Sequence, residues 1–260
     1  MSSAERNGVL KRLLAVSRRK GAAYLVLIDP EKSTKEHAGM ISAIASENGA
    51  DAILVGGSGA VSSSRLRSVV LSAKKRSGLP VIVFPGSAEQ VSKSADAILF
   101  MSLANSRNPK YLMGEQVRAA GRIRELGLEA IATGYILVGT SDGRKSRVEK
   151  KTGTKPIRGE DVVSHALACK YLGFRTLYLE AGSGAARPVP AGLVRRVKRA
   201  TGLPLIVGGG IRTPREAGML AEAGGDFIVT GNVLEELAPE RTEILIRDIA
   251  RAVHYRKVRR

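Results

Sequence analysis

Glycines follow three consecutive short apolar runs in the C-terminal part of the sequence, within residues 178–184, 208–211 and 230–232. Glycine lets backbone N–H groups approach a ligand closely, and the N-termini of helices favour anions. Each stretch lies between a strand-like run and a helical one, so all three should meet at one edge of a parallel sheet. Together they predict a phosphate-binding site, to which Ser183 could add a hydroxyl and Asn232 an amide. For any single stretch, the alternative is a tight turn without a ligand.

A carboxylate and a hydroxyl follow the first two strand-like runs. Asp29 precedes Pro30 at the end of the run 24–28, and Ser58 lies in the glycine-rich stretch 55–59. Hard oxygen ligands of this kind suit Mg²⁺ when diphosphate oxygens and water complete its coordination. The two residues therefore predict a magnesium site at the same edge. The alternative is that Asp29 only caps a turn or a helix.

Glu180 ends an apolar run beside the predicted phosphate site. A phosphate repels a neighbouring carboxylate, whereas the hydroxyl of a polyol is a favourable partner for it. Glu180 could therefore orient or deprotonate a nucleophilic alcohol. Tyr178 lies two residues earlier, on the same side of the expected strand, and could share this role. The alternative is ordinary polarity at the end of a strand.

Apolar runs alternate with helical patterns along the whole chain. The expected strands are residues 24–28, 52–55, 81–84, 97–101, 128–138, 175–179, 204–207 and 226–229. This order predicts an α/β fold, a (β/α)8 TIM-like barrel. Residues 85–94 are too short for a full helix, so the third helix should be reduced. A Rossmann-like sheet is disfavoured because no glycine follows the first strand and residues 182–187 lack the third glycine of its motif.

Long helical patterns cover residues 34–48, 64–77, 110–126, 160–172 and 234–253, and Pro239 should interrupt the last of them. The length of 260 residues suits a single barrel domain spanning 1–260. No apolar run approaches the roughly 20 residues of a membrane span, and no signal-peptide pattern is present, so a cytoplasmic protein is expected. Cys169 is the only cysteine, and the three histidines lack zinc-ligand spacing, which excludes a disulfide framework and disfavours a zinc site.

The formal net charge of +18 gathers in three basic regions. They are an N-terminal segment (6–20), the loop 139–158, which is the only extended irregular stretch expected, and the C-terminal tail (251–260). Their simplest interpretation is a solvated basic surface. Aromatic residues make up only 4% and tryptophan is absent, so no platform for base stacking is evident and no nucleic-acid partner is expected. A peripheral contact with an anionic membrane is compatible with the charge.

Taken together, the motifs resemble the geranylgeranylglyceryl phosphate synthase family. The resemblance runs in order from about residue 22 to 235, through residues 27–32, 55–59, 102–109, 178–184, 208–212 and 231–232. It implies a modified (β/α)8 barrel with a reduced third helix. It also implies a Mg²⁺-dependent prenyltransferase that joins sn-glycerol 1-phosphate to geranylgeranyl diphosphate, forming the first ether bond of archaeal membrane lipids. Members form dimers and larger homo-oligomers.

By similarity, Asp29 and Ser58 would bind Mg²⁺, and Glu180 with Tyr178 would be catalytic. The residues matching those that hold sn-glycerol 1-phosphate are Tyr178, Leu179, Glu180, Ala181, Gly182, Ser183, Gly184, Gly209, Gly210, Gly231 and Asn232. Residues 102–113 and 133–138 resemble segments beside the prenyl channel. Bacterial relatives use longer heptaprenyl diphosphates and usually differ at 181–184, so the archaeal activity is favoured. No residue role carries over to the basic stretch 144–158.

Two other classes of function share part of this pattern. An isomerase or cyclase on the same barrel would use the phosphate site but would need neither Mg²⁺ nor an apolar groove. A non-enzymatic basic barrel would bind nucleic acid or a membrane surface with a steep dependence on salt. No helix-turn-helix, zinc module or RNA-binding signature accompanies the basic regions.

Overall fold

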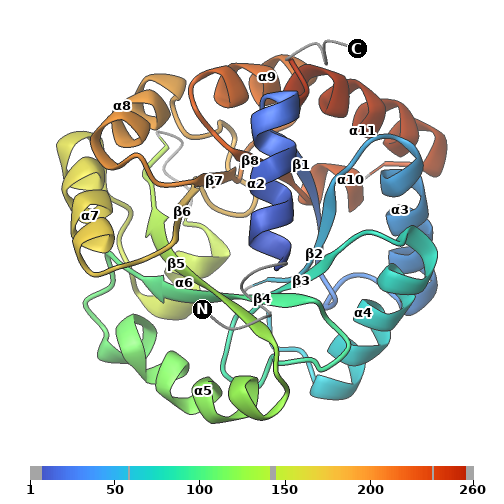
Figure 1. Ribbon diagram of the computed structural model, residues 1–260, viewed down its shortest axis with the longest axis horizontal. Coiled ribbons are helices and arrows are strands. Elements are labelled where there is room, and N and C mark those ends of the chain that lie inside the picture. Colours follow the sequence, from blue (N-terminus) through green and yellow to red (C-terminus); the bar gives the residue numbers. More distant parts are fainter. Residues whose placement is uncertain (1–7, 58, 141–144, 236, 256–260) are drawn as a thin grey trace.

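Eight parallel strands close into a barrel in sequence order (Figure 1). The computed structural model describes residues 8–57, 59–140, 145–235 and 237–255. The strands are β1 (Ala23–Ile28), β2 (Ala52–Gly56), β3 (Val81–Phe84), β4 (Ala97–Leu103), β5 (Glu129–Leu137), β6 (Thr176–Glu180), β7 (Leu205–Gly208) and β8 (Phe227–Thr230). Pairing of β1 with β8 completes the ring. The predicted (β/α)8 barrel is confirmed.

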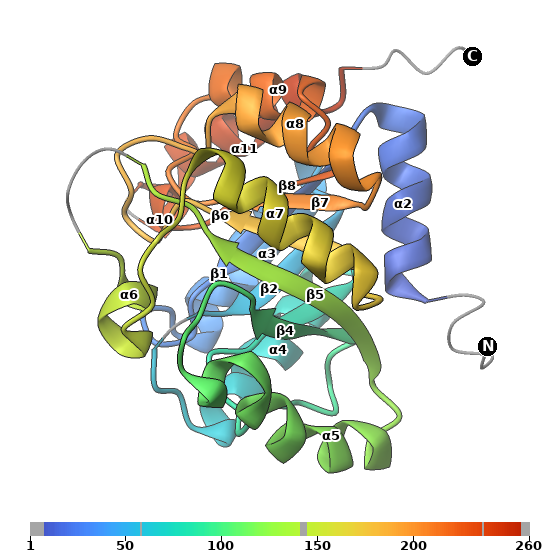
Figure 2. The ribbon, with the colours of Figure 1, turned by 90° about the vertical axis from the view of Figure 1, so that its left-hand side faces the viewer.

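Helices form an outer layer around the strands (Figures 1 and 2). The longer ones are α3 (Lys35–Glu47), α4 (Ser63–Ser77), α5 (Glu115–Glu125), α7 (Gly159–Tyr171), α8 (Ala191–Thr201), α9 (Pro214–Glu222) and α11 (Pro239–Val253). Side-chain caps fix several of their starts: Thr34 accepts a hydrogen bond from the His37 N–H, and Ser62 accepts one from Arg65. Pro239 begins α11 and separates it from the short α10 (Asn232–Glu235), which confirms the predicted interruption.

The alternation of side chains along each strand divides the core in two. Residues such as Leu25, Leu54 and Leu99 belong to a cluster inside the barrel. Their neighbours in sequence, such as Ile53 and Ile98, pack between the strands and the helices. This period of two places Tyr178 inside the barrel and turns the buried side chain of Leu179 outward.

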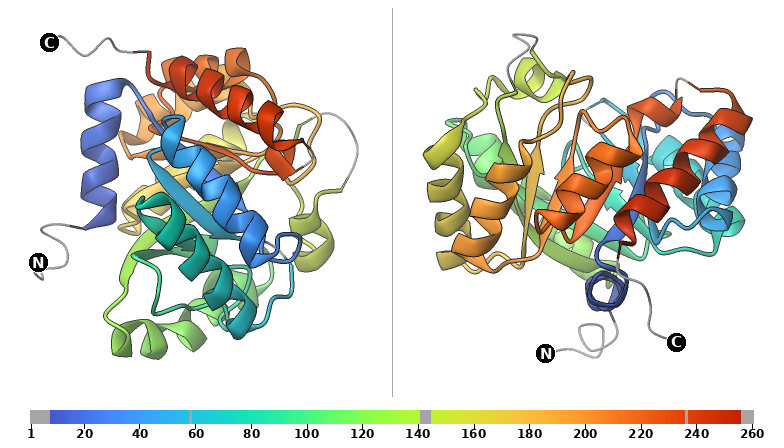
Figure 3. Two further views of the ribbon diagram at one scale, coloured as in Figure 1. Left: turned by 90° about the vertical axis from the view of Figure 1, so that its right-hand side faces the viewer. Right: turned by 90° about the horizontal axis from the view of Figure 1, so that it is seen from above.

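An N-terminal helix, α2 (Val9–Lys20), lies across one end of the barrel (Figures 1 and 3). We expected only a basic segment here. Val9, Leu10 and Leu13 pack into the interior cluster, and the Val9 N–H donates to the Glu129 carboxylate at 2.5 Å. The basic residues of α2 lie on its solvent side. Its apolar residues cover the N-terminal end of the barrel strands.

The connection from β3 to β4 contains no helix: residues 85–96, all of them described, form turns and bends. The predicted reduction of the third helix is confirmed. The buried side chain of Gln90 holds the segment, since it accepts from the Gly86 N–H at 2.7 Å and donates to the Gly59 carbonyl at 3.0 Å. The missing helix leaves the outer layer open beside β3 and β4.

Two expectations from the sequence need correction. The pattern 110–126 is not one regular α-helix, because it begins with a π-helical turn, η1 (Lys110–Gly114), before α5. The loop 139–158 is not wholly irregular, because it contains the helix α6 (Arg147–Thr152). A capping box starts α6: Ser146 accepts from the Glu149 N–H, and the Glu149 carboxylate accepts from the Ser146 N–H. Residues 141–144 of this loop, 1–7 of the N-terminal segment and 256–260 of the tail lie outside the described residues.

Candidate active site

A polar pocket opens at the C-terminal ends of the strands, opposite α2. It holds about 810 Å³ of space, part of it open to solvent. Most of the residues singled out in the sequence line it, namely Asp29, Tyr178, Glu180, Ser183, Gly184, Gly209, Gly210, Gly231 and Asn232. The fold therefore brings the three glycine-bearing turns together, as expected for the C-terminal edge of a parallel barrel.

The turn after β7 can pack as closely as it does only because it consists of glycine. Gly209 and Gly210 have φ angles of 81° and 69°, which favour glycine. A Cβ atom on Gly209 would collide with Oε1 of Glu180, and one on Gly210 would collide with the carbonyl of Arg187. These glycines thus form the wall against which the Glu180 carboxylate is packed.

Glu180 is buried at the end of β6, with 6% of its surface exposed. Its Oε1 accepts a hydrogen bond from the Gly182 N–H at 2.7 Å. Burial raises the pKa of Glu180 to about 7, although the hydrogen bonds from Gly182 and from the Tyr178 side chain lower it in part. A carboxyl with this pKa can hold or release a proton near neutral pH, which suits a general base.

Three aromatic rings line the pocket beneath Glu180. The ring of Tyr178 stacks on Phe84 with centroids 5.4 Å apart, and Tyr135 lies 5.2 Å from Tyr178. Burial, followed by the charge of Glu180, raises the pKa of Tyr178 well above its usual value, so its hydroxyl stays protonated. Sequence reasoning did not select Phe84. Its position as the last residue of β3 could have indicated that it lies at the same edge of the barrel as the other site residues.

Asn232 and Ser183 join two of the glycine-bearing turns. The Asn232 side-chain amide donates to Oγ of Ser183 at 2.8 Å, and Nζ of Lys32 lies 3.4 Å from Oδ1 of Asn232. Lys32 and Arg212, the latter lining the pocket, were not selected from the sequence. Both are the last residues of the motif stretches 27–32 and 208–212, which follow β1 and β7, but neither had been given a role. They add positive charge to this side of the site.

Asp29 lines the polar pocket at the end of β1, the strand that pairs with β8, and 13% of its side chain is exposed. Its Oδ1 accepts from the Glu31 N–H at 2.9 Å, and its Oδ2 lies 3.6 Å from Nη1 of Arg147. The backbone at Gly57 passes beside this carboxylate. Ser58, the second predicted ligand, lies outside the described residues.

The donor set around Asp29 fits a hard cation that takes much of its coordination from a substrate. Within the described ranges, no group of three or more His, Cys, Asp or Glu side chains could hold a metal ion. Asp29 nevertheless presents a carboxylate oxygen to the pocket beside the stretch that leads to Ser58. Mg²⁺ commonly uses one or two carboxylates together with substrate phosphates, so the residues present are compatible with it.

Three of the singled-out residues do not line the polar pocket. The side chain of Leu179 packs outward against the helices. Gly182 contributes its N–H to Glu180. Ala181 lines a neighbouring cavity, together with Lys145, Lys150 and other residues of the basic loop.

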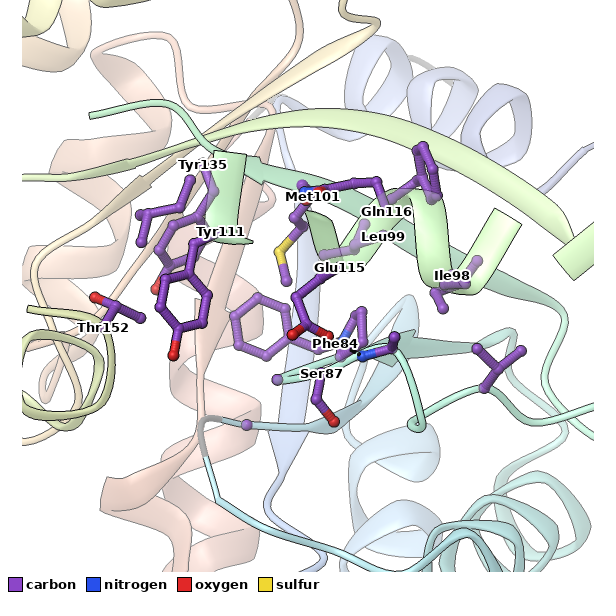
Figure 4. A pocket seen from close by; sticks show the side chains of 18 of the residues that line it. Phe84, Ser87, Ile98, Leu99, Met101, Tyr111, Glu115, Gln116, Tyr135 and Thr152 are labelled. Carbon is purple, nitrogen blue, oxygen red and sulfur yellow. Dashed lines mark hydrogen bonds between the residues drawn. The ribbon is translucent and has the colours of Figure 1, made fainter. Parts of the chain in front are cut away.

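A second, apolar pocket adjoins the polar one where the helix after β3 is missing. It holds about 820 Å³ of space, and Met101 of β4 and Tyr111 of η1 line it alongside Phe84 (Figure 4). Further apolar lining comes from Val91, Ile98, Leu99, Phe100, Leu103, Ala119 and Ile123. Four residues line both pockets: Gly57, Phe84, Tyr135 and Val148. The two pockets therefore meet, and together they can accept a molecule with an apolar tail and a polar head.

A family model described as the PcrB family matches residues 15–253 of the chain. The chain belongs to this family. Among curated members, the geranylgeranylglyceryl phosphate synthase of Thermofilum pendens is 45% identical over 89% of this chain and 90% of its own length. The enzyme of the same name from Pyrococcus furiosus is 42% identical over 95% of this chain and 98% of its own.

The overall fold is similar to that of a solved synthase structure. The chain superposes with a TM-score of 0.89 and 36% identity on the (S)-3-O-geranylgeranylglyceryl phosphate synthase of Thermoplasma acidophilum, solved in complex with its substrate sn-glycerol-1-phosphate. That comparison covers 96% of this chain and 99% of the other. The thiamine phosphate pyrophosphorylase of Pyrococcus furiosus, at 14% identity and a TM-score of 0.59, shares the fold alone.

Proposed function

We propose that this PcrB-family chain is a geranylgeranylglyceryl phosphate synthase. It joins sn-glycerol 1-phosphate to geranylgeranyl diphosphate and releases diphosphate, forming 3-O-geranylgeranyl-sn-glyceryl 1-phosphate with the first ether bond of archaeal membrane lipids. The observation that carries this proposal is the junction of the two pockets, which places a polar site containing Glu180 against an apolar one. The 42–45% identity to the two synthases named above supports the same assignment.

The glycine-bearing turns are proposed to hold sn-glycerol 1-phosphate. Backbone N–H groups near Gly184, Gly210 and Gly231, with the linked side chains of Ser183 and Asn232, offer donors to the phosphate. Arg212 adds a cation at the same edge. Residues 178–182 flank these turns at the end of β6, beside β7, and Leu179 takes part through its backbone only. The glycerol hydroxyls then face Glu180.

Glu180 is proposed to accept the proton of the attacking alcohol. The C3 hydroxyl of the glycerol donates to the carboxylate while its oxygen forms a bond to C1 of the prenyl chain. The bond from C1 to the diphosphate oxygen breaks, and its electron pair leaves with the diphosphate. Tyr178, whose hydroxyl interacts with the Glu180 carboxylate, orients it. Holding the two reactants in this geometry lowers the barrier by removing much of the entropic cost of their encounter.

Asp29 and Ser58 are proposed to hold Mg²⁺ beside the leaving diphosphate. When bound there, the ion would neutralise charge on the leaving group. Asp29 is positioned for this by its turn, in which the Glu31 N–H fixes Oδ1 and leaves Oδ2 directed toward the pocket residue Arg147.

The apolar pocket is proposed to receive the prenyl tail. Its walls are mostly aliphatic and aromatic, and each CH₂ group buried there is worth about 0.8 kcal/mol. This requirement separates the proposal from a phosphate-dependent isomerase or cyclase on the same barrel, which has no tail to bury. Tight binding of a long-chain prenyl diphosphate is therefore expected only for the synthase.

We also propose that the protein forms a homo-oligomer. Met113 and Val117 expose 63% and 68% of their surface on successive turns of η1 and α5, which offers an apolar face for contact with a second copy.

A peripheral contact with an anionic membrane is a second proposal, which rests on the positive net charge of the chain. Within the part of the chain that is described, no helix has the length and apolar character needed to cross a membrane.

The direct test is a product assay with both substrates and Mg²⁺. Purified protein is incubated with sn-glycerol 1-phosphate or its 3-phosphate enantiomer and with prenyl diphosphates of several chain lengths. We expect an ether product from the 1-phosphate with the C20 diphosphate and much less product from the enantiomer. Product formed best from a much longer chain would move the assignment to another synthase of the same fold.

A further inference from the structure

The helix α6 presents two cations on the face that borders both pockets. Arg147 lines the polar pocket, Lys151 lines the apolar pocket, and Val148 between them lines both. Residues four apart on a helix lie one above the other on the same face. In Figure 2, α6 lies at the end of the molecule opposite α2, where the strands terminate.

Several contacts outside α6 fix its position. The Tyr111 hydroxyl donates to the carbonyl of Lys151 at 3.2 Å, and Oγ1 of Thr154 donates to Oγ of Ser106 at 3.0 Å. Beyond the helix, Ile157 pairs with Val138 as an isolated parallel bridge. The two cations are thus carried by a structured element that is attached to the barrel.

Arg147 reaches the carboxylates that follow β1. Its Nη1 lies 2.8 Å from Oε2 of Glu31 and 3.6 Å from Oδ2 of Asp29. A guanidinium has five N–H donors in a planar fork, so these contacts leave donors for an anion in the pocket. About 45% of the Arg147 side chain is exposed, which gives it room to reorient.

Lys151 lies on the apolar side of the junction, three residues after Val148 on α6. Its Nζ donates to the carbonyl of Gly86 at 2.8 Å, at the start of the irregular segment after β3. Partial burial lowers the pKa of the Lys151 ammonium below its usual value. An anion placed beside the ammonium would offset this cost of burial, because opposite charge favours the protonated form.

Acidic residues surround the place where the two pockets meet, so an anionic substrate that binds there needs cations beside it. Asp29, Glu31 and Glu180 all lie on the polar side, so a diphosphate entering between the pockets meets like charge. Glu115, which lines the apolar pocket, is already occupied by the Ala88 N–H and by Arg118. Arg147 lines the polar pocket and Lys151 lines the apolar pocket, and both belong to the helix that contributes the shared residue Val148.

We propose that Arg147 and Lys151 bind the diphosphate of the prenyl substrate, one from each side of Val148, and so position the leaving group. This inference rests on the proposed function, because a molecule whose tail fills the apolar pocket and whose C1 approaches Glu180 must place its diphosphate at the junction. Arg147 turns from Asp29 toward the phosphate oxygens when substrate enters, while Glu31 remains its second partner. The pair selects a diphosphate over an uncharged prenyl alcohol.

The test compares R147Q and K151Q with K150Q. Lys150 is on the same helix and loses the same charge, but it lines the neighbouring cavity. We expect the KM for prenyl diphosphate to rise about tenfold or more in R147Q and in K151Q, the change that follows from losing one charge-assisted hydrogen bond. The KM for sn-glycerol 1-phosphate should stay unchanged in R147Q and K151Q, and K150Q should keep the wild-type KM for prenyl diphosphate. R147K, which keeps the charge, should recover part of the loss.

A second readout needs no turnover. Inorganic pyrophosphate is titrated into each protein by calorimetry, with chelator present, after circular dichroism has shown that the variants are folded. Binding should weaken about tenfold or more in R147Q and K151Q relative to K150Q. Equal pyrophosphate affinity and equal KM in all three variants would overturn the proposal. Absence of product from wild-type protein would instead refute the synthase assignment, whatever the pyrophosphate result.

Discussion

Glu180 is the residue in which burial and chemistry are most closely linked. Burying a glutamate side chain costs free energy unless its oxygens accept hydrogen bonds. Here the Gly182 N–H and the Tyr178 side chain supply them. Its burial raises the pKa to about 7, so the carboxylate becomes a stronger proton acceptor than an exposed glutamate. The same packing that buries Glu180 depends on Gly209.

Replacing Glu180 with glutamine should remove the proton acceptor. We expect kcat to fall by about 10²–10⁴-fold, with little change in the KM for prenyl diphosphate. Because the carboxyl is protonated below its pKa, wild-type kcat/KM should rise with pH through about 7 and level off above it. The substrate phosphate titrates near pH 6 in both proteins, so the difference between the two pH profiles isolates Glu180. An unchanged profile in Glu180→Gln would exclude it as the base.

Gly209→Ala should cost more stability than a positive φ alone explains. The added Cβ meets Oε1 of Glu180, whereas at Gly78, with a φ of 64°, it meets nothing within 4 Å. We expect Gly78→Ala to lower the free energy of unfolding by about 1–2 kcal/mol and Gly209→Ala to lower it further, with loss of turnover. Urea denaturation of the two variants makes the comparison. Equal losses of unfolding free energy in the two variants would show that the Glu180 side chain shifts away from the added Cβ atom without a further cost.

At the scale of elements, periodicity predicted the strands well because each buried strand reads as a short apolar run between more polar or glycine-bearing segments. The break at Pro239 and the missing helix after β3 were also predictable, from one proline and from a segment too short for a helix. The helices α2 and α6 were not predicted, because basic residues make up much of their sequence. A Ser146–Glu149 capping box was the local signal for α6, and Leu10 with Leu13 was the signal for α2.

The helix α2 should contribute to stability and not to catalysis. Leu10 is 3% exposed and packs into the barrel interior at the end away from the pockets. We expect Leu10→Ala to reduce the free energy of unfolding by about 2–5 kcal/mol while leaving both KM values unchanged. Leu71→Ala, at a position 46% exposed on α4, is the matched control and should have little effect. A changed KM in folded Leu10→Ala would contradict this, because it would show that the packing of α2 affects substrate binding at the other end of the barrel.

At the scale of the whole molecule, the polar half of the site was far easier to predict than the apolar half. Glycine, aspartate and glutamate at strand ends are visible as types in sequence, and the barrel gathers them at one edge. The apolar pocket arises from side chains on β3, β4, η1 and α5 that look like ordinary core residues. Their function depends on the helix that is missing beside them, which only the three-dimensional arrangement reveals.

Removal of the divalent cation should stop the reaction without unfolding the protein. Asp29→Asn keeps the shape of the side chain but removes its charge, and we expect kcat to fall by about 10²-fold or more. Calorimetric titration with Mg²⁺ in the presence of pyrophosphate should show weaker binding in the variant. Full activity with chelator present would sink the magnesium assignment, even if the synthase activity stands.

The central claim is that the polar and apolar pockets form one site for two substrates. Its most direct test is the formation of ether product by wild-type protein given sn-glycerol 1-phosphate, geranylgeranyl diphosphate and Mg²⁺, measured beside the same reaction with the 3-phosphate enantiomer. We predict geranylgeranylglyceryl phosphate from the first mixture and at most a minor amount from the second. No ether product from either mixture, by protein that is folded and binds the prenyl diphosphate, would contradict the claim.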